Sequence, residues 1–385
     1  MRAYVFTDPA LASQARRFVW LGIDTEKPAN AALRKRLSIA ALPSYFILDP
    51  ADERVAVRWV GGATAPQLAR LLDDARVAVA TGTTTSGKAA ETPADAALAR
   101  ADDAYGRADY AAAAPAFREA LAKAPTGWPR LGRAVESFLY TLDQIEGYEE
   151  GAQLALDTYP RLPHSPSTAN IAASGLDCAL SLPREHPKRA SLVAALESIT
   201  RTVVQDRSIP MAADDRSGVY ISLLDARQDA RDSTGAHAVA GAWAAFLEGE
   251  AQRAKTPDAR AVFDPHRLSA YLELGTPERA VPMLTASERD LPDDYNPPAR
   301  LATAYKAMKR WSEALAASDR AMAKAYGPRK LLLYQTRSDI YLGLADSTAA
   351  RRTLSEAVSF AEGLPTGQRS ETTIASLKKK LQALN

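Results

Sequence analysis

The sequence has very little cysteine: one residue, Cys178, among 385. A disulfide framework and dithiol redox chemistry each need two thiols, so the chain as given excludes both. Long apolar runs are also missing, since no stretch approaches the roughly 20 residues that span a bilayer. The formal net charge is only +2, from 48 basic and 46 acidic residues, which produces no field that attracts nucleic acid. Membranes and nucleic acids are therefore not expected as partners.

A secretory signal is also missing from the first residues. Residues 1–17 have no apolar segment of signal type and carry Asp8 and Pro9 early. We therefore expect the chain as given to be cytoplasmic, whereas a signal peptide upstream of Met1 would make it periplasmic. The single Cys178 lies in an apolar helical segment, where a buried structural thiol is the usual case.

Motifs for cofactor chemistry are incomplete. The segment Gly82–Lys88, GTTTSGK, has the spacing of a phosphate-binding loop, but Ala89 stands where a Ser or Thr should hold magnesium. Pro93 would also interrupt the helix that such a loop requires. No two of the four histidines have ligand spacing, and no nucleophile elbow is present. We expect no nucleotide, no metal, no cofactor and no catalytic residue in the chain as given.

The composition changes at residues 81–95, TGTTTSGKAAETPAD, where small and polar residues replace patterned apolar ones. This pattern is typical of a flexible linker. Short strands and helices are expected before it, and Ala-rich segments with helical spacing after it. We therefore predict an α/β domain over residues 1–80 and a helical domain over residues 96–385.

Local signals predict the order α, β, α, β, β, α in the first domain. Asp8 before Pro9 is an N-cap followed by proline, and Thr64 to Gln67 has capping-box spacing. The predicted elements are a helix through Arg17, a buried strand Phe18 to Ile23, a helix from Pro28 to Ile39, a β-hairpin with strands Tyr45 to Leu48 and Arg54 to Val60, and a helix from Thr64 to Val79.

This order resembles the C-terminal two thirds of a bacterial thioredoxin-like domain. The matching segments are Val5-Phe6-Thr7-Asp8-Pro9, Asp24-Thr25-Glu26, Leu42-Pro43-Ser44 and Gly61-Gly62. The resemblance implies that Pro43 follows a cis peptide bond. It also implies that the loop of Leu42 and Pro43 offers backbone hydrogen bonds to a bound substrate chain.

The chain departs from that family where it matters chemically, because the preceding strand and its C-x-x-C motif are missing. Two explanations stay open. Either Met1 is an internal start and the cysteines lie upstream, or residues 1–7 replace the missing strand in a degenerate domain. We favour the first, because the loss of a central strand leaves unpaired edges on both of its neighbours.

After the linker, the sequence repeats with a period of 34. Tyr271 matches Tyr305, and Ala280 matches Ala314. Small residues at helix crossings with this period resemble tetratricopeptide repeats, which stack paired helices into a solenoid. The copies are 97–125, 261–294, 295–328 and 331–364, with a weaker copy at 135–163. Residues 164–260 are expected to form divergent helical hairpins in the same stack.

Such a solenoid presents a concave groove, lined by the first helix of each repeat, that binds segments of other proteins. A solvated helix face without a ligand is the open alternative. The repeat positions predict the groove residues His266, Ser269, Asn296, Arg300, Thr303, Lys306, Gln335, Thr336 and Asp339.

The sequence thus predicts a mainly α protein: a tetratricopeptide-type α-helical solenoid preceded by a partial α/β thioredoxin-like domain. We expect a protein-interaction module that binds a protein or peptide client and has no dithiol activity as given. The alternative is a thiol–disulfide oxidoreductase whose C-x-x-C lies upstream of an internal start.

Overall fold

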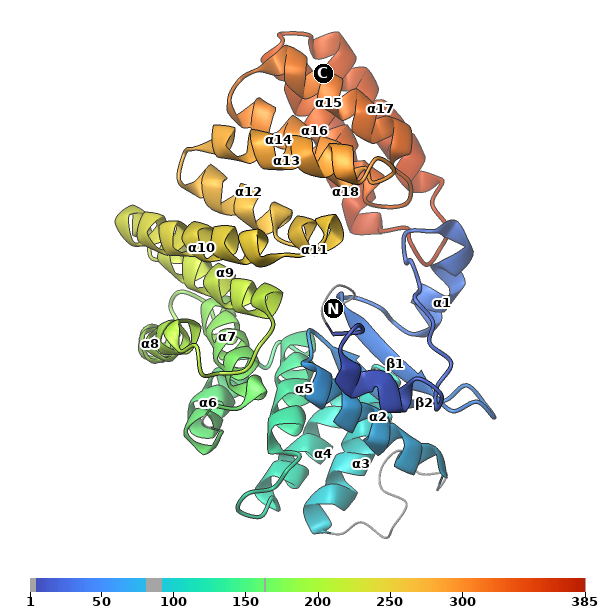
Figure 1. Ribbon diagram of the computed structural model, residues 1–385, viewed down its shortest axis with the longest axis vertical. Coiled ribbons are helices and arrows are strands. Elements are labelled where there is room, and N and C mark those ends of the chain that lie inside the picture. Colours follow the sequence, from blue (N-terminus) through green and yellow to red (C-terminus); the bar gives the residue numbers. More distant parts are fainter. Residues whose placement is uncertain (1–4, 81–91, 163, 385) are drawn as a thin grey trace. The chain divides into compact units, whose positions relative to one another are not determined.

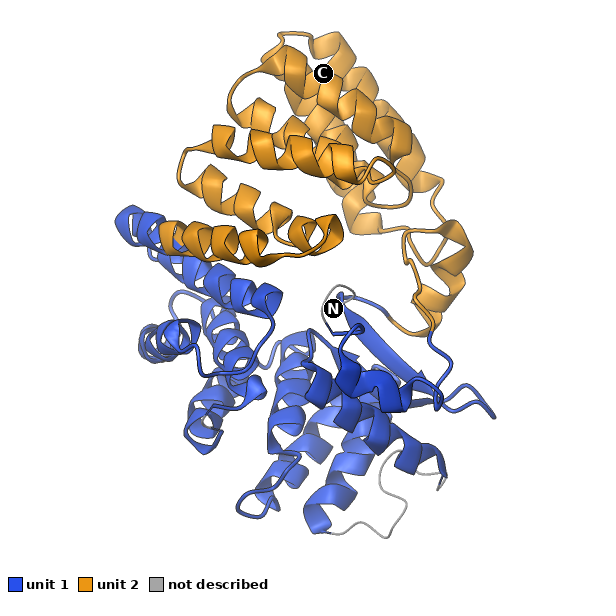
Figure 2. Cartoon of the chain, in the orientation of Figure 1, with its two compact units in different colours: residues 1–20, 39–239 blue, residues 21–38, 240–385 orange. Residues whose placement is uncertain are grey.

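The computed structural model describes residues 5–80, 92–162 and 164–384. The chain divides into two compact units, each containing a short N-terminal stretch and a longer run of helices (Figure 2). Unit 1 is residues 1–20 and 39–239, and unit 2 is residues 21–38 and 240–385. The unit boundary at residue 239 lies inside helix α10, Ser233–Arg253.

Helices dominate both units, and two strands are the only ones among the described residues (Figure 1). Unit 1 holds a 3-10 helix Pro9–Gln14, β1 Ser44–Leu48, β2 Val55–Val60, α2 Ala65–Ala80, α3 Pro93–Gly106, α4 Tyr110–Ala122, α5 Leu131–Gln144, α6 Tyr148–Thr158, α7 Pro166–Ser181, α8 Arg189–Gln205 and α9 Ala213–Asp229. Unit 2 holds α1 Ala31–Arg36, α11 Pro257–Ala261, α12 Asp264–Glu273, α13 Ala280–Asp290, α14 Asn296–Ala307, α15 Trp311–Lys324, α16 Lys330–Gly343, α17 Ser347–Glu362 and α18 Glu371–Gln382. Short 3-10 turns lie at Pro28–Asn30, Tyr159–Arg161 and Pro277–Arg279. No helix in the described part of the chain is long and apolar enough to cross a membrane.

Consecutive helices pack as antiparallel pairs, and the same turn recurs between the two helices of most pairs. In each, one residue adopts a left-handed conformation, with φ between +55° and +68°. The next backbone N–H then donates to the carbonyl five residues earlier at 2.7–2.9 Å, which is the Schellman arrangement that ends a helix. The left-handed residues are Ala108, Glu146, Arg231, Gly275, Lys309 and Ala345. The backbone thus has the architecture of a mainly α, tetratricopeptide-type solenoid, in which successive helix pairs contain the same kind of turn.

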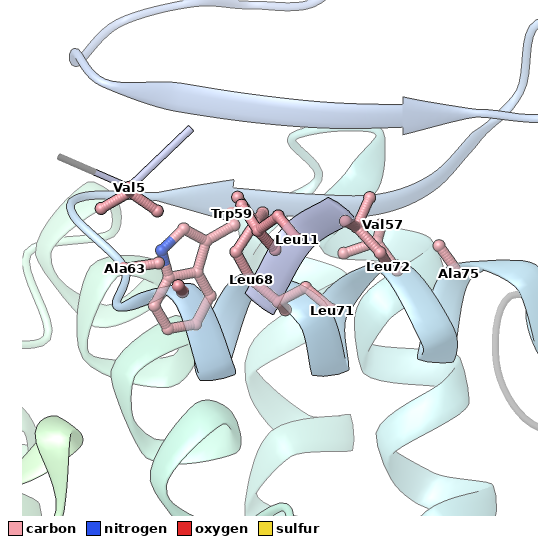
Figure 3. Close-up of a cluster of buried hydrophobic side chains, with 10 residues drawn as sticks. Val5, Leu11, Val57, Trp59, Ala63, Leu68, Leu71, Leu72 and Ala75 are labelled. Atoms are coloured by element: carbon pink, nitrogen blue, oxygen red, sulfur yellow. The ribbon is translucent and has the colours of Figure 1, made fainter. Parts of the chain in front are cut away.

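Strand β2 is buried on both faces. On one face Val57 and Trp59 pack with Leu68 and Leu72 of α2 in the cluster of Figure 3. On the other, Ala56 and Arg58 are almost fully buried, and β2 contacts α3. Because successive side chains of a strand point to opposite sides, β2 joins the α/β segment to the first repeat of unit 1.

Several predicted elements are confirmed. The hairpin forms with Tyr45 opposite Trp59 and an irregularity between Ile47 and Leu48. The capping box forms as well: the Thr64 backbone N–H donates to Gln67 Oε1 at 2.9 Å, and the Gln67 N–H donates to Thr64 Oγ1 at 3.3 Å.

The predicted strand Phe18 to Ile23 was wrong. These residues form no strand, and the side chains of Val19 and Leu21 are 88% and 77% exposed. An apolar run becomes a buried strand only where a neighbouring strand can pair with it, and none of the described residues does so. The first helix is also shorter than predicted, because it ends at Gln14 as a 3-10 helix instead of reaching Arg17.

The described residues give no evidence for the thioredoxin-like domain that the resemblance implies. Two strands make a single hairpin, and the extra strand expected before it is missing. The predicted linker lies mostly outside the described residues, as does Gly82–Lys88, and its last residues start α3 with Thr92 as the N-cap. The division into domains at residues 81–95 stays a prediction.

Candidate functional site

The predicted groove residues lie on α12, α14 and α16, the first helices of the last three repeats, all in unit 2. Helix α14 contacts both α12 and α16, so these helices lie side by side. Most of the side chains are half-buried, whereas Ser269 and Asp339 are exposed. We call this set, together with the exposed Leu332 of α16, the ladder face.

Charged and polar groups of the ladder face pair from one helix to the next. Lys306 Nζ donates to Asp339 Oδ2 at 2.7 Å, which joins α14 to α16. Gln335 Oε1 accepts a hydrogen bond from Lys380 of α18, which joins α16 to the last helix. These contacts tie neighbouring repeats together, and their partial exposure leaves them open to exchange with a ligand.

The other ladder residues make local contacts. Burial lowers the pKa of Arg300, against the opposing effect of Asp264. The His266 ring lies 5.8 Å from the Trp243 ring, and Thr303 Oγ1 donates to the Ala299 carbonyl at 3.3 Å. The Asn296 side chain donates to Asp294 at 2.7 Å at the start of α14. The predicted residues therefore lie on neighbouring helices, and Lys306 contacts Asp339 across two of them, while the others are held by their own neighbours. That they act together as a groove stays a prediction.

Sequence reasoning missed the apolar member of this face. Leu332 of α16 is 64% exposed. It precedes Gln335 by three residues and Asp339 by seven, so the three side chains share one side of the helix. The sequence could have indicated Leu332, because its spacing from Gln335 and Asp339 puts it on the outer side of α16. A leucine on that side does not belong to the apolar core between the two helices of the repeat.

The Leu42–Pro43 peptide bond is cis, which confirms the expectation from the resemblance. The loop is held to the end of β2, since the Gly61 N–H donates to the Pro43 carbonyl at 2.9 Å. Leu42 is 56% exposed, and Ser44 Oγ donates to the Ala41 carbonyl at 2.6 Å. The loop is therefore accessible, while its role in binding a substrate chain stays a prediction.

In unit 1, the side chain of Arg58 is enclosed by aromatic rings. Its guanidinium carbon lies 5.3 Å from the centre of the Phe46 ring, 5.5 Å from Tyr105 and 5.6 Å from Tyr110. Arg58 is 2% exposed. Cation–π attraction of this kind is strongest when water is excluded, so the cage holds β2 against α3 and the turn into α4. No sequence motif marks it.

A cluster of acidic side chains lies among the neighbouring helices α5, α7 and α9 of unit 1. Burial raises the pKa of Glu136 to about 7, and burial with the charge of Asp214 raises that of Asp215 to about 7. Asn170 of α7 donates to Glu136 Oε2 at 2.7 Å. Burial, together with Asp215, also raises the pKa of Tyr45. Both carboxyls change protonation near neutral pH, and Asp215 lies beside the hairpin, where its charge acts on Tyr45 of β1.

A cavity of about 550 Å³ opens between α4, α5 and α6 of unit 1. Arg118 of its lining donates to both carboxylate oxygens of Glu150, at 2.5 and 2.7 Å. The lining combines apolar side chains with three carboxylates and one guanidinium. It is lined by Arg118, Leu121, Phe138, Glu149, Glu150, Gln153, Leu154 and Asp157.

Cys178 is buried between helices. A Cβ atom placed on Gly151 of α6 would lie 2.7 Å from the Cys178 sulfur, so α6 and α7 pack closely there. Burial and the charge of Asp143 raise the thiol pKa to about 12, which keeps it protonated and unreactive at neutral pH. Within the described residues, no group of His, Cys, Asp and Glu is arranged to hold a metal ion.

No known family profile and no curated protein matches the chain. Among solved structures, it is similar to a tetratricopeptide repeat protein from Parabacteroides merdae ATCC 43184, with 11% identity, a TM-score of 0.48, and coverage of 75% of this chain and 99% of that chain. It is also similar to the APC/C hetero-tetramer Cut9–Hcn1, with 14% identity, a TM-score of 0.36, and coverage of 75% and 50%. Both TM-scores are below 0.5, so the repeat assignment rests on the paired helices and recurring turns of this chain.

Proposed function

We propose that this protein is an interaction module that binds a segment of a client protein on the ladder face of unit 2. The observation that carries the proposal is the exposed Leu332 beside polar groups from three successive first helices. An exposed apolar side chain contributes to binding affinity when a client covers it, and the surrounding polar groups contribute specificity by pairing with the client. Lys306 and Lys380 favour a client segment that has a carboxylate next to an apolar anchor.

The test is site-specific crosslinking in the native host cell. A photoreactive amino acid at Leu332 should give a discrete adduct with a client, and the same amino acid at the exposed Arg352 of α17 should give none. The double variant Lys306→Ala, Gln335→Ala should lose the Leu332 adduct, whereas Lys379→Ala, on an exposed position of α18, should retain it. Equal adducts at Leu332 and Arg352, or none at either, would contradict the proposal.

A second candidate function is thiol–disulfide exchange by a form of the protein that carries cysteines upstream of Met1. The 3-10 helix Pro9–Gln14, α1, β1, β2 and α2 follow one another in the order that resembles part of a thioredoxin-like domain, except that the predicted strand Phe18 to Ile23 does not form. Mass spectrometry of the N-terminus of the endogenous protein tests this alternative. A C-x-x-C in the N-terminal peptides, together with insulin reduction by that form, would favour it over a purely binding role.

A further inference from the structure

A short acidic turn of the N-terminal region is bound by two loops of the C-terminal repeats, all within unit 2. Asp24 Oδ2 accepts a hydrogen bond from the Tyr326 hydroxyl at 2.6 Å. Glu26 Oε2 accepts one from the Arg329 backbone N–H at 2.8 Å, at the start of α16. A carboxylate is favoured at a helix N-terminus, where backbone N–H groups lack partners within the helix.

The second loop, which contains Gln368, binds the backbone of the same turn. Gln368 Nε2 donates to the carbonyls of Thr25 at 2.8 Å and Lys27 at 3.0 Å. Gln368 is 5% exposed and Thr25 is 7% exposed, so the bond to the Thr25 carbonyl is shielded from water, and the bond to the Lys27 carbonyl is partly buried. A buried amide that bonds two carbonyls of one segment fixes that segment's path independently of its side chains.

Two glycines shape the loops around the turn. A Cβ atom on Gly367 would lie 1.9 Å from the Ala31 carbonyl oxygen, and one on Gly327 would lie 2.3 Å from that of Glu26. Neither distance is sterically allowed, so only glycine at these positions permits the turn to bind. Gly327 also has a positive φ of +65°, whereas Gly367 is restricted by contact with the turn alone.

The turn has its own internal structure and exposed connections. Asp24 Oδ1 accepts a bond from the Glu26 N–H at 2.9 Å, and Asn30 Nδ2 donates to the Asp24 carbonyl at 2.8 Å. The residues before the turn are exposed, as Val19 and Leu21 show, and Leu42 on the return path is exposed too. The turn can therefore leave its site as a preformed unit without breaking the apolar cluster of β2 and α2.

We propose that the loops 325–329 and 364–369 form a docking site for an acidic turn, and that residues 24–31 are its releasable occupant within the chain. The site recognises a turn with the sequence pattern Asp-x-Glu. The Asp carboxylate binds the Tyr326 hydroxyl, and the Glu carboxylate binds the N-terminus of α16. A partner protein that presents the same kind of turn competes with residues 24–31. The docking site shares no residue with the ladder face.

The first experiment uses Gly367→Ala in the full chain, because the added methyl meets only the turn. Trypsin should cleave after Arg34, Lys35 or Arg36 about tenfold faster than in the unchanged chain, since the docked state is depopulated. Gly241→Ala is the matched control, because a Cβ there meets nothing within 4 Å. Unchanged cleavage in Gly367→Ala, with the thermal midpoint also unchanged, would overturn the proposal.

The second experiment supplies the turn in trans as a labelled peptide of residues 22–33, with binding measured by fluorescence anisotropy. The double variant Asp24→Ala, Glu26→Ala weakens the tethered turn but keeps the site, so it should bind the peptide at least about tenfold more tightly than the unchanged chain, where the tethered turn competes at high effective concentration. The variant Gly367→Ala should not bind. Equal binding to all three proteins, or binding to none while circular dichroism shows them folded, would overturn the docking site.

Discussion

The turn between the two helices of a repeat depends on one residue, which adopts the left-handed backbone conformation. Glycine occupies this position only at Gly275, while Ala108, Lys309 and Ala345 adopt positive φ with a Cβ atom present. A non-glycine residue in this region costs roughly 1–2 kcal/mol, which the hydrogen bond across the turn must offset. These turns therefore contain removable strain.

Ala345→Gly should stabilise unit 2 by about 0.5–1 kcal/mol, because relief of left-handed strain exceeds the extra backbone entropy that glycine loses on folding. Urea unfolding followed by circular dichroism measures the change. The control Ala316→Gly, on the exposed side of α15, should destabilise by about 1 kcal/mol, since the backbone there is helical. Destabilisation by both variants would contradict this account of the turn.

Arg58 shows how one side chain can join two parts of unit 1. Arg58→Lys should destabilise the protein by about 1–3 kcal/mol, because an ammonium group is more strongly hydrated than a guanidinium and cannot lie flat against three rings. Thermal unfolding tests this. Arg76→Lys on the exposed side of α2 should leave the midpoint within experimental error, and an equal loss in both variants would exclude a specific role for the cage.

At the scale of elements, the packing of α9 against the hairpin buries a carboxyl group. A Cβ atom on Gly62 would lie 2.0 Å from the carboxylate of Asp215 on α9. This close approach explains why burial dominates the raised pKa of Asp215. The charge of Asp215 in turn acts on the buried Glu136 of α5. Ionisation of these groups opposes the packing that brings them together.

Stability should therefore depend on pH through Glu136. Its pKa is about 7 in the folded state and near 4.5 in the unfolded chain, so the folded state binds more protons between those values. The stability of the unchanged protein is then highest below about pH 4.5 with respect to this group, and falls as the pH rises to about 7. Glu136→Gln should be more stable than the unchanged protein at pH 8, and the two should converge near pH 5, as measured by urea unfolding. A constant difference across this range would contradict the raised pKa.

At the scale of the whole molecule, a repeat stack transmits stability only between neighbours. The last helix, α18, covers the apolar side of α17 through Ile374 and Leu377, in a cluster with Leu354 and Ala361. Lys378 adds an ion pair to Glu362 at 2.6 Å. Helix α18 thus shields the end of the described repeats from water.

Leu377→Ala should cost about 2–5 kcal/mol locally, because a fully buried leucine leaves a cavity. Hydrogen exchange should show lost protection in α16, α17 and α18, while α3 to α6 of unit 1 keep theirs. Uniform loss across both units would indicate that the chain unfolds as one cooperative body, in conflict with the nearest-neighbour picture.

Much of the fold follows from short-range signals. The capping box at Thr64, the hairpin around Asp49 and the 34-residue spacing of Tyr271 and Tyr305 all depend on residues close in sequence, and the structure contains the corresponding elements. The predicted groove residues also lie on neighbouring first helices. Their pairing, as between Lys306 and Asp339, was not predictable, because side-chain direction across repeats depends on how the helices pack.

The sequence by itself determined the helical repeats, the hairpin and the lack of a dithiol, because periodicity, capping and cysteine count are local or compositional properties. Only the tertiary structure decided the conformation and contacts of residues 18–31. The apolar run Phe18 to Ile23 does not form a strand, because no described strand pairs with it. The acidic turn is bound through Asp24 and Glu26 by Tyr326 and Arg329, which lie about 300 positions later in the chain. Contacts between segments so distant in sequence are set by the packing of the repeats, which no local pattern records.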